Sequence, residues 1–353
     1  MKQCNAVLTF AMLLGALLAS GAARADVFHM DPGLTSLEMV PVGNPGNAAD
    51  TRYATPGYGA VAYEYQIGKY EVTAGQYTEF LNAVAKTDAY WLYSTSMWSD
   101  YYAAKIQRSG SAGTYAYSVA ADRANRPVHY VSWGAAARFA NWLSNGQPTT
   151  GVQTLSTTED GSYYVNGATS HTALTAVTRK PTATWVIPTE DEWYKAAYHK
   201  NDGVTGNYFD YPTSSDSVPS NDLVNPDPGN NANFQYSDID YTIGSPYYRT
   251  NVGEFENSES PYNTFDQGGN LWEWNETAIT GSSRGEKGGS WFNYSGNLAA
   301  SDRGGHSSPG WGYGNLGFRV ARVPEPGSIT LLVCGAVAGL VWWRRRMYSS
   351  RSA

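Results

Sequence analysis

The segment GGNLWEW, residues 268–274, places an acid between two tryptophans directly after a pair of glycines. Adjacent glycines permit a tight backbone turn, and a carboxylate held between indole rings needs a cation or hydrogen-bond donors. Five more segments of similar character occur around it: YQIGKYEVT (65–73), RPVHYVSW (126–133), IPTEDEW (187–193), GGSW (288–291) and NLGFR (315–319). Each segment alone is weakly diagnostic, but the ordered set of six is specific.

Three amphipathic helices are expected, and each follows a start signal. Thr73 with Gln76, and Thr189 with Glu192, form capping boxes, while Ser132 is a helix N-cap. Apolar side chains then recur at helical spacing. Extended segments are expected at residues 62–70, 128–131, 184–187 and 317–321. The Asn-, Asp-, Pro- and Gly-rich stretch 203–260 predicts surface loops, so the pattern favours an α+β fold that is poor in regular secondary structure.

The N-terminus has the order of a signal peptide. Lys2 provides the positive start, residues 6–18 form a short apolar core, and Ala23-Arg24-Ala25 fits a signal peptidase site. A first buried helix is the alternative, but Thr9 is the only polar residue between positions 6 and 18. We therefore predict a signal peptide over residues 1–25, which would export the protein.

The C-terminus has three parts in a fixed order. The motif VPEPGS (323–328) precedes an apolar run at 329–343 and then Arg344-Arg345-Arg346. This run predicts a short membrane helix with cytoplasmic arginines. The arrangement over 323–353 resembles the PEP-CTERM sorting signal, which implies an exosortase-type protease as partner. It also implies inner-membrane anchoring, then release to the cell surface or exopolysaccharide matrix of a Gram-negative bacterium. An uncleaved anchor is the alternative.

Residues 26–322 form the remaining domain, and their composition excludes several kinds of function. The chain carries 31 acidic against 24 basic residues and shows no basic block, so nucleic acid is not an expected partner. Its two cysteines, Cys4 and Cys334, both lie in the predicted targeting segments. The domain therefore has no disulfide, thiolate metal site or cysteine nucleophile.

The six ordered segments resemble the formylglycine-generating enzyme, or sulfatase-modifying factor, family along nearly the whole domain. The resemblance implies a variant of the C-type lectin fold. The family's oxidase binds copper through a cysteine pair located between the GGS-aromatic and GFR segments or just beyond them. Residues 292–316 contain no cysteine, and Val320 follows Arg319. Because thiolate copper chemistry requires sulfur ligands, we predict no formylglycine-generating activity and no bound copper.

Iron chemistry and hydrolase chemistry also find little support in the sequence. A facial iron triad needs two histidines and a carboxylate. The five histidines show no i, i+2 or i, i+4 pair, although His129 and His306 could converge in the fold. The run GSSRG (281–285) has the letters of a hydrolase elbow but is interpreted as a turn, with no clear strand before it or helix after it. A metal-dependent oxidoreductase of the formylglycine-generating or non-haem iron type, with a site not recognisable in the sequence, is the second hypothesis.

Ligand binding is the first hypothesis, because aromatic residues are concentrated in predicted loops. Loops on a rigid scaffold commonly carry recognition, and amphipathic rings suit both sugars and peptides. The alternative is that the rings only cover a loop-rich core. The loop aromatics are Tyr90, Trp91, Tyr93, Trp98, Tyr101, Tyr102, Tyr247, Tyr248, Trp311 and Tyr313. Four candidate ligand-binding residues for a glycan or peptide follow: Trp311, Tyr313, His306 and Asn293.

Arg319 lies in an apolar run and must be paired if it is buried, because an unpaired buried charge is strongly unfavourable. An acid at the start of the third helix is the expected partner, Glu192 or its neighbour Glu190, with Glu273 as the other option. We predict a structural ion pair between Arg319 and Glu192.

Calcium is the one expected cofactor, and the family resemblance implies where it binds. Calcium accepts carboxylate and carbonyl oxygens together. The family's main site uses two side chains and two carbonyls, at positions that match Asp266, Gly269, Leu271 and Glu273. A second site would begin at Asn233 and Phe234, with Asp240 as a further ligand, although the spacing departs from the family pattern. The alternative is that Glu273 pairs with an arginine such as Arg319.

Overall fold

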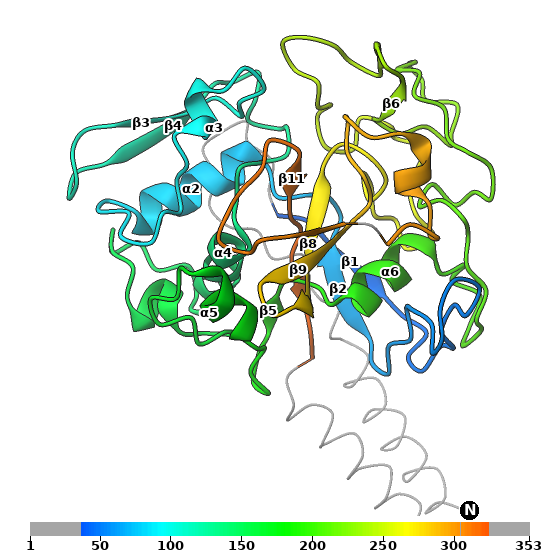
Figure 1. The fold of residues 1–353 in the computed structure, drawn as a ribbon, viewed down its shortest axis with the longest axis horizontal. Coiled ribbons are helices and arrows are strands. Elements are labelled where there is room, and N and C mark those ends of the chain that lie inside the picture. Colours follow the sequence, from blue (N-terminus) through cyan, green and yellow to red (C-terminus); the bar gives the residue numbers. More distant parts are fainter. Residues whose placement is uncertain (1–36, 304, 325–353) are drawn as a thin grey trace, which may run out of the picture.

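Two four-stranded sheets lie at the centre of the protein in the computed structural model, which describes residues 37–303 and 305–324 (Figure 1). The first sheet is antiparallel and has the order β1-β2-β12-β5. Its strands are β1 (Met39–Val42), β2 (Tyr65–Gly68), β12 (Ala321–Arg322) and β5 (Trp185–Val186). The second sheet has the order β10-β9-β8-β11. Its strands are β10 (His306–Ser307), β9 (Ser283–Lys287), β8 (Trp272–Thr280) and β11 (Leu316–Gly317).

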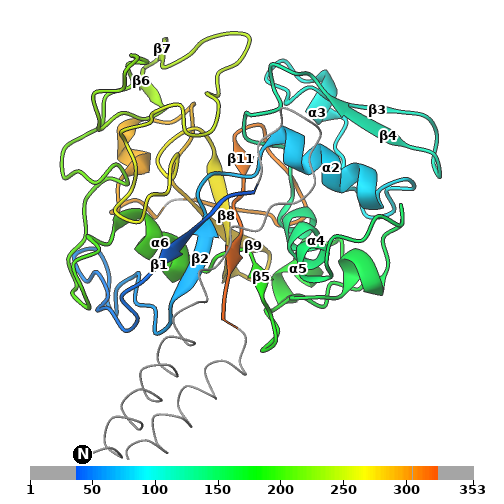
Figure 2. The same ribbon diagram turned by 180° about the vertical axis from the view of Figure 1, so that it is seen from behind.

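The three predicted helices are present, and each begins where its cap predicts. They are α2 (Ala74–Val84), α4 (Trp133–Ser144) and α6 (Glu190–Tyr198). Thr73 and Thr189 both form complete capping boxes, and the Ala135 N–H donates to Ser132 Oγ at 3.1 Å. Helices α2 and α4 lie to one side of the sheets and α6 to the other (Figures 1 and 2). Shorter helices are α3 (Ser96–Ser99), α5 (His171–Ala176), a π-helix (Leu155–Glu159) and a 3-10 helix (Ser295–Leu298).

The predicted strands are only partly confirmed. Strands β2 and β5 lie inside the expected segments 62–70 and 184–187. Residues 128–131 form no strand, because Tyr130 adopts a φ of 61° that ends the extended backbone. Within the run 281–285, residues 281 and 282 form a turn and the other three begin β9. The expectation of no clear strand before the run is wrong, because the nine-residue strand β8 precedes it. It therefore belongs to a hairpin, and the strand–turn–helix context of a hydrolase elbow is absent from this part of the described chain.

The chain crosses from one sheet to the other between Gly317 and Ala321, which the sequence suggested as a single strand. Phe318, Arg319 and Val320 lie on this crossing and are fully buried. Phe318 packs edge-on against Phe139 of α4, with 5.4 Å between ring centroids. The crossing therefore places Arg319 at the centre of the domain, between the two sheets.

Most of the remaining chain is irregular, as the composition of 203–260 predicted. Two short hairpins occur, β3 (Ile106–Ser109) with β4 (Ala116–Val119), and β6 (Gln235–Ser237) with β7 (Asp240–Tyr241). None of the helices in the described residues is long and apolar enough to cross a bilayer. The predicted signal peptide 1–25 and the predicted membrane helix 329–343 lie outside the described residues.

Candidate functional site

A fully buried ion pair joins segment 268–274 to segment 315–319. Strand β11 runs parallel to β8 with Gly317 opposite Glu273, and this register brings Arg319 to Glu273. Arg319 Nε and Nη2 donate to the two Glu273 oxygens at 2.6 Å each, and Trp193 Nε1 donates to Oε2 at 2.8 Å. Both charged side chains have 0% exposure. The pair is held in the two-pronged geometry that is strongest for arginine and carboxylate.

The predicted pairing of Arg319 with Glu192 is therefore wrong. Glu192 instead accepts hydrogen bonds from Arg179 Nη1 and Nη2 at 2.8 and 2.9 Å. Its Oε2 also accepts the Thr189 N–H within the capping box at 2.7 Å. Capping fixes the Glu192 carboxylate beside its own helix terminus, where Arg179 reaches it. Glu273, the other acid considered from the sequence, is the observed partner.

Two more acids lie near this pair, so carboxylates outnumber cations. Glu71 is buried, and Asn270 Nδ2 donates to its Oε2 at 3.0 Å, while Oε1 has no hydrogen-bond partner among the described residues. Desolvation raises the pKa of Glu71 well above its usual range, and the charges of Asp266 and Glu273 add to this. Desolvation also raises the pKa of Asp266 to about 6, although its Oδ2 accepts the Gly253 N–H. This excess of acid favours uptake of a proton or a cation.

The residues that family resemblance assigns to calcium lie at the entry to β8. Gly269 has a φ of 85°, and a Cβ there would lie 2.2 Å from the Asn233 carbonyl oxygen, so only glycine fits. Asp266 and Glu273 would supply carboxylates, and Gly269 and Leu271 carbonyls, which is an oxygen set of the kind Ca²⁺ prefers. Within residues 37–303 and 305–324, no three His, Cys, Asp or Glu side chains form a metal-binding group. Calcium here would therefore depend on the two carbonyls as well as the two acids.

The three residues of the predicted second calcium site are placed differently from one another. Asn233 is buried, and its Nδ2 donates to the Tyr248 carbonyl and to Asn270 Oδ1 at 3.0 Å each, while its Oδ1 finds no partner within residues 37–303 and 305–324. Phe234 is fully buried. Asp240 lies in the exposed β6–β7 hairpin, and in the described part of the chain no hydrogen bond joins it to Asn233 or Phe234. The structure therefore joins Asn233 to Asn270 and leaves Asp240 on the surface.

Histidine positions give no iron site in the described residues. His129 is fully buried, with Nε2 2.7 Å from the Tyr102 carbonyl oxygen. Desolvation holds the pKa of His129 well below its usual range, and the charge of Arg249 adds to this. His306 lies exposed on the edge strand β10, where it pairs with Gly285. His129 therefore has a structural environment, and the described contacts do not join it to His306.

An aromatic cluster lies at the GGSW segment, residues 288–291. Six rings form a continuous set, which we call the Trp291 face: Tyr101, Tyr102, Tyr241, Tyr248, Trp291 and Phe292. Trp291 is central, with its ring centroid 4.7 Å from that of Tyr248 and 5.1 Å from that of Tyr102. Tyr101 and Phe292 are exposed at the edge of the face. The loop itself is ordered by polar contacts, since Ser290 Oγ donates to Asn293 Oδ1 at 2.5 Å.

The four predicted ligand-binding residues do not form one site. Asn293 lies next to the Trp291 face, where its carbonyl accepts the Gln235 N–H. Trp311 lines a separate cavity, and Tyr130 lines the same cavity. The carbonyl of Tyr313 accepts the N–H of Tyr130, so Tyr313 lies close to this cavity. His306 lies apart from both, on β10. The sequence missed Trp291, Tyr241 and Phe292 as binding candidates, although Trp291 lies within the GGSW segment.

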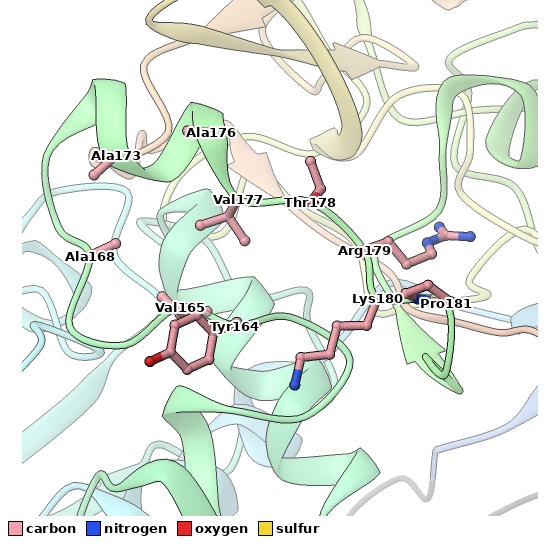
Figure 3. Close-up of a pocket in the computed structure, with 10 residues that line it drawn as sticks. All are labelled: Tyr164, Val165, Ala168, Ala173, Ala176, Val177, Thr178, Arg179, Lys180 and Pro181. Atoms are coloured by element: carbon pink, nitrogen blue, oxygen red, sulfur yellow. The ribbon is translucent and has the colours of Figure 1, made fainter.

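Another concave region lies beside α5 and holds about 440 Å³ (Figure 3). Alanine and valine side chains form much of its wall. Lys180 extends toward Tyr164 there, with Nζ 5.8 Å from the ring centroid, and it also pairs with Asp160. Arg179 is held by Glu192 and Glu276. Because its charged groups are already paired, this cavity is a weaker candidate than the two aromatic sites.

Two central sheets, few helices and long ordered loops define an α+β protein in which loops build the surface. The chain belongs to the family of sulfatase-modifying factor enzyme 1-like domains, whose model matches residues 32–324. The predicted fold class is thereby confirmed. No curated protein matches the chain.

Several solved structures are similar over most of the chain. CarF has 18% sequence identity and a TM-score of 0.47, covering 82% of this chain and 99% of CarF. Treponema denticola variable protein 1 has 18% identity and a TM-score of 0.48, covering 85% and 99%. PvdO from Pseudomonas aeruginosa has 17% identity and a TM-score of 0.44, covering 86% and 100%.

Proposed function

We propose that this domain is a non-catalytic binding module for a glycan or peptide, and that the Trp291 face is its main contact surface. The observation that carries the proposal is the continuous set of six rings, in which Trp291 is buried at the centre and Tyr101 and Phe292 are exposed. Aromatic rings of this kind bury large area at low entropic cost and are enriched in binding hot spots.

The position of the Trp291 face suits a displayed module. Tyr101 and Tyr102 follow α3, and Tyr241 lies on β7. Elements α3 and β7 lie at the edge of the molecule opposite to the one where the described chain ends, after β12 (Figures 1 and 2). A domain held through its C-terminus would therefore present these rings away from its attachment.

Calcium belongs to this proposal as a structural cofactor at Asp266, Gly269, Leu271 and Glu273. Support comes from the acid excess around Arg319 and from the glycine-only turn at Gly269. Each Glu273 oxygen accepts a hydrogen bond from Arg319, and within the described residues Oε1 has this one donor, which leaves it a lone pair for a cation. Bound calcium would supply a positive charge to balance the carboxylates of Glu71 and Asp266.

Export and sorting complete the proposal. The signal peptide over residues 1–25 would export the domain, and the PEP-CTERM-like segment 323–353 would anchor it in the inner membrane. An exosortase-type protease would then release it to the cell surface or extracellular polysaccharide. Cell fractionation with an antibody to the domain tests this order, because replacing Pro324 and Pro326 by alanine should retain the protein in the membrane fraction.

Arrays of glycans and of peptides, probed with the full-length protein, test the binding function. We expect binding that Tyr101→Ala and Phe292→Ala each weaken about tenfold, whereas Tyr164→Ala, an exposed ring elsewhere, leaves it unchanged. Silent arrays, or binding indifferent to both substitutions, would contradict the proposal. Stoichiometric iron or copper in the purified protein would instead support the metal-dependent oxidoreductase alternative.

A further inference from the structure

A second aromatic site occupies a cavity of about 560 Å³ between loop 87–95 and loop 309–312. Its volume lies within the range of about 300–1,000 Å³ found for ligand pockets. Two tryptophans stand at this cavity with unusually large exposure, Trp91 at 71% and Trp311 at 60%. We propose that it is a binding site for a neutral oligosaccharide, separate from the Trp291 face.

The first wall holds Trp91 in a strained and fixed conformation. Trp91 has a φ of 54°, a left-handed value that is rare for bulky residues. Its loop is fixed because the Asp88 carboxylate accepts the Leu92 and Tyr93 N–H groups at 2.7 and 3.3 Å. The Leu92 carbonyl in turn accepts the hydroxyl of Tyr77 in α2 at 2.7 Å. The surrounding structure thus maintains a local strain that leaves an indole ring in solvent, a pattern found at ligand contacts.

The second wall fixes Trp311 equally well. The His171 ring packs edge-on against Trp311 with 4.8 Å between centroids, and the Gly310 N–H donates to His171 Nδ1 at 3.3 Å. A Cβ at Gly312 would lie 2.2 Å from the Tyr130 carbonyl carbon, so the loop backbone lies directly on Tyr130. Neither loop must order on binding, which lowers the entropic cost of association.

The polar groups between the two walls favour an uncharged ligand. Arg108 Nη1 lies 3.2 Å from Asp88 Oδ2, so the two formal charges of this pair neutralise each other. Arg108 lines the cavity, its guanidinium stacks on Tyr115 at 4.3 Å, and its side chain stays partly exposed, so it is an available hydrogen-bond donor for a ligand. Ser94, Thr95 and Ser132 line the same space and add hydroxyl groups.

A pyranose ring matches a cavity that combines exposed indole rings with neutral hydrogen-bonding groups. Its C–H faces are apolar and suit indole rings, while its hydroxyl groups both donate and accept hydrogen bonds. An anionic sugar or an acidic peptide would find Arg108 already neutralised by Asp88. An apolar peptide segment would bury the charged groups of Asp88 and Arg108 and the hydroxyl groups of the cavity without supplying hydrogen-bond partners. The observations therefore favour neutral oligosaccharides over both alternatives.

Isothermal titration of the full-length protein with hexamers of β-1,4-glucose, β-1,3-glucose and α-1,6-mannose tests the inference. At least one hexamer should bind, and Trp91→Ala and Trp311→Ala should each raise its Kd at least about tenfold. The matched control is Trp98→Ala, an exposed indole on α3 that does not line the cavity. Melting curves of all variants should coincide with that of the unaltered protein.

The outcomes separate this inference from the proposed function. Hexamer binding that is lost in Tyr101→Ala but retained in Trp91→Ala would overturn the cavity assignment and leave the Trp291 face as the sugar site. Binding of only uronate oligomers or peptides would overturn the neutral-sugar assignment. No binding of any hexamer would overturn it as well, while peptide binding at the Trp291 face would still stand.

Discussion

Replacing Arg319 by alanine should destabilise the domain by about 3–5 kcal/mol, because it removes one partner of a buried ion pair. Arg319 makes five hydrogen bonds in the structure. Two go to Glu273, and the others go to the carbonyls of Gly68, Lys69 and Phe265 at 2.9, 3.3 and 2.8 Å. In the part of the chain that the structure describes, the substitution leaves the Glu273 charge with the Trp193 N–H as its one donor. Since a domain of this kind is stable by about 5–15 kcal/mol in total, much of its stability would be lost.

Urea unfolding followed by tryptophan fluorescence measures this loss, and two variants separate charge from packing. Removing both charges with Arg319→Met and Glu273→Leu should recover part of the stability, since apolar replacement of a whole buried pair is often neutral. The matched control is Lys200→Ala, which removes an exposed pair with Asp216 and should cost at most about 1 kcal/mol. An Arg319→Ala domain that unfolds within about 1 kcal/mol of the unaltered protein would refute the reasoning.

Three further predictions concern the metal, the activity and the pH. Chelation of calcium should lower the melting temperature by on the order of 5 °C, and added calcium should restore it; no shift and no bound calcium would leave the Arg319–Glu273 pair as the sole account. Incubation with copper and a sulfatase peptide should yield no aldehyde by mass spectrometry, because the domain has no cysteine. Desolvation raises the pKa of Glu286 to about 7 from its ordinary 4.5, so its contribution to stability is present below pH 4.5 and is lost as pH rises through 7. Glu286→Gln should therefore stabilise the domain at pH 8 by about 2–3 kcal/mol, whereas Glu38→Gln on the surface should not; equal unfolding curves would contradict this.

The helix starts could be predicted from the sequence, because they depend on interactions between neighbouring residues. The starts of α2, α4 and α6 follow from Thr73, Ser132 and Thr189, because a cap involves atoms only three residues apart. The C-type lectin-like fold was inferred from the resemblance to a family and not from these local patterns. The strand predicted at residues 128–131 does not form, because Tyr130 has a left-handed φ. The loop at Gly312 and Tyr313, which is distant in sequence, packs on Tyr130 and favours this conformation.

The partner of Arg319 and the Trp291 face could not be predicted from the sequence, because both depend on contacts between distant segments. Three acids were reasonable partners for Arg319, and only the parallel register of β11 with β8 selects Glu273. The Trp291 face gathers rings from four separate segments, so no single motif marks it. Both cases depend on contacts between residues tens to hundreds of positions apart.

Buried arginines explain how a domain with so little regular structure keeps its loops in place. Backbone carbonyls in irregular segments need donors when they are buried. Arg284 donates to the carbonyls of Leu174 and Thr175 at 2.9 and 3.1 Å. Arg249 donates to the Tyr102 and Gly314 carbonyls, and so ties the Trp291 face to the loop that follows Trp311.

Arg249 lies next to both proposed binding sites. Desolvation lowers the pKa of Arg249 to about 9, with the charges of Arg123 and Arg126 adding to this, and the residue still carries its charge at neutral pH. Its guanidinium lies 5.8 Å from the centre of the Trp291 ring. One cation therefore orders the backbone under both proposed sites, and the two should lose affinity together if Arg249 is replaced, whereas replacing Trp91 or Phe292 should affect only one.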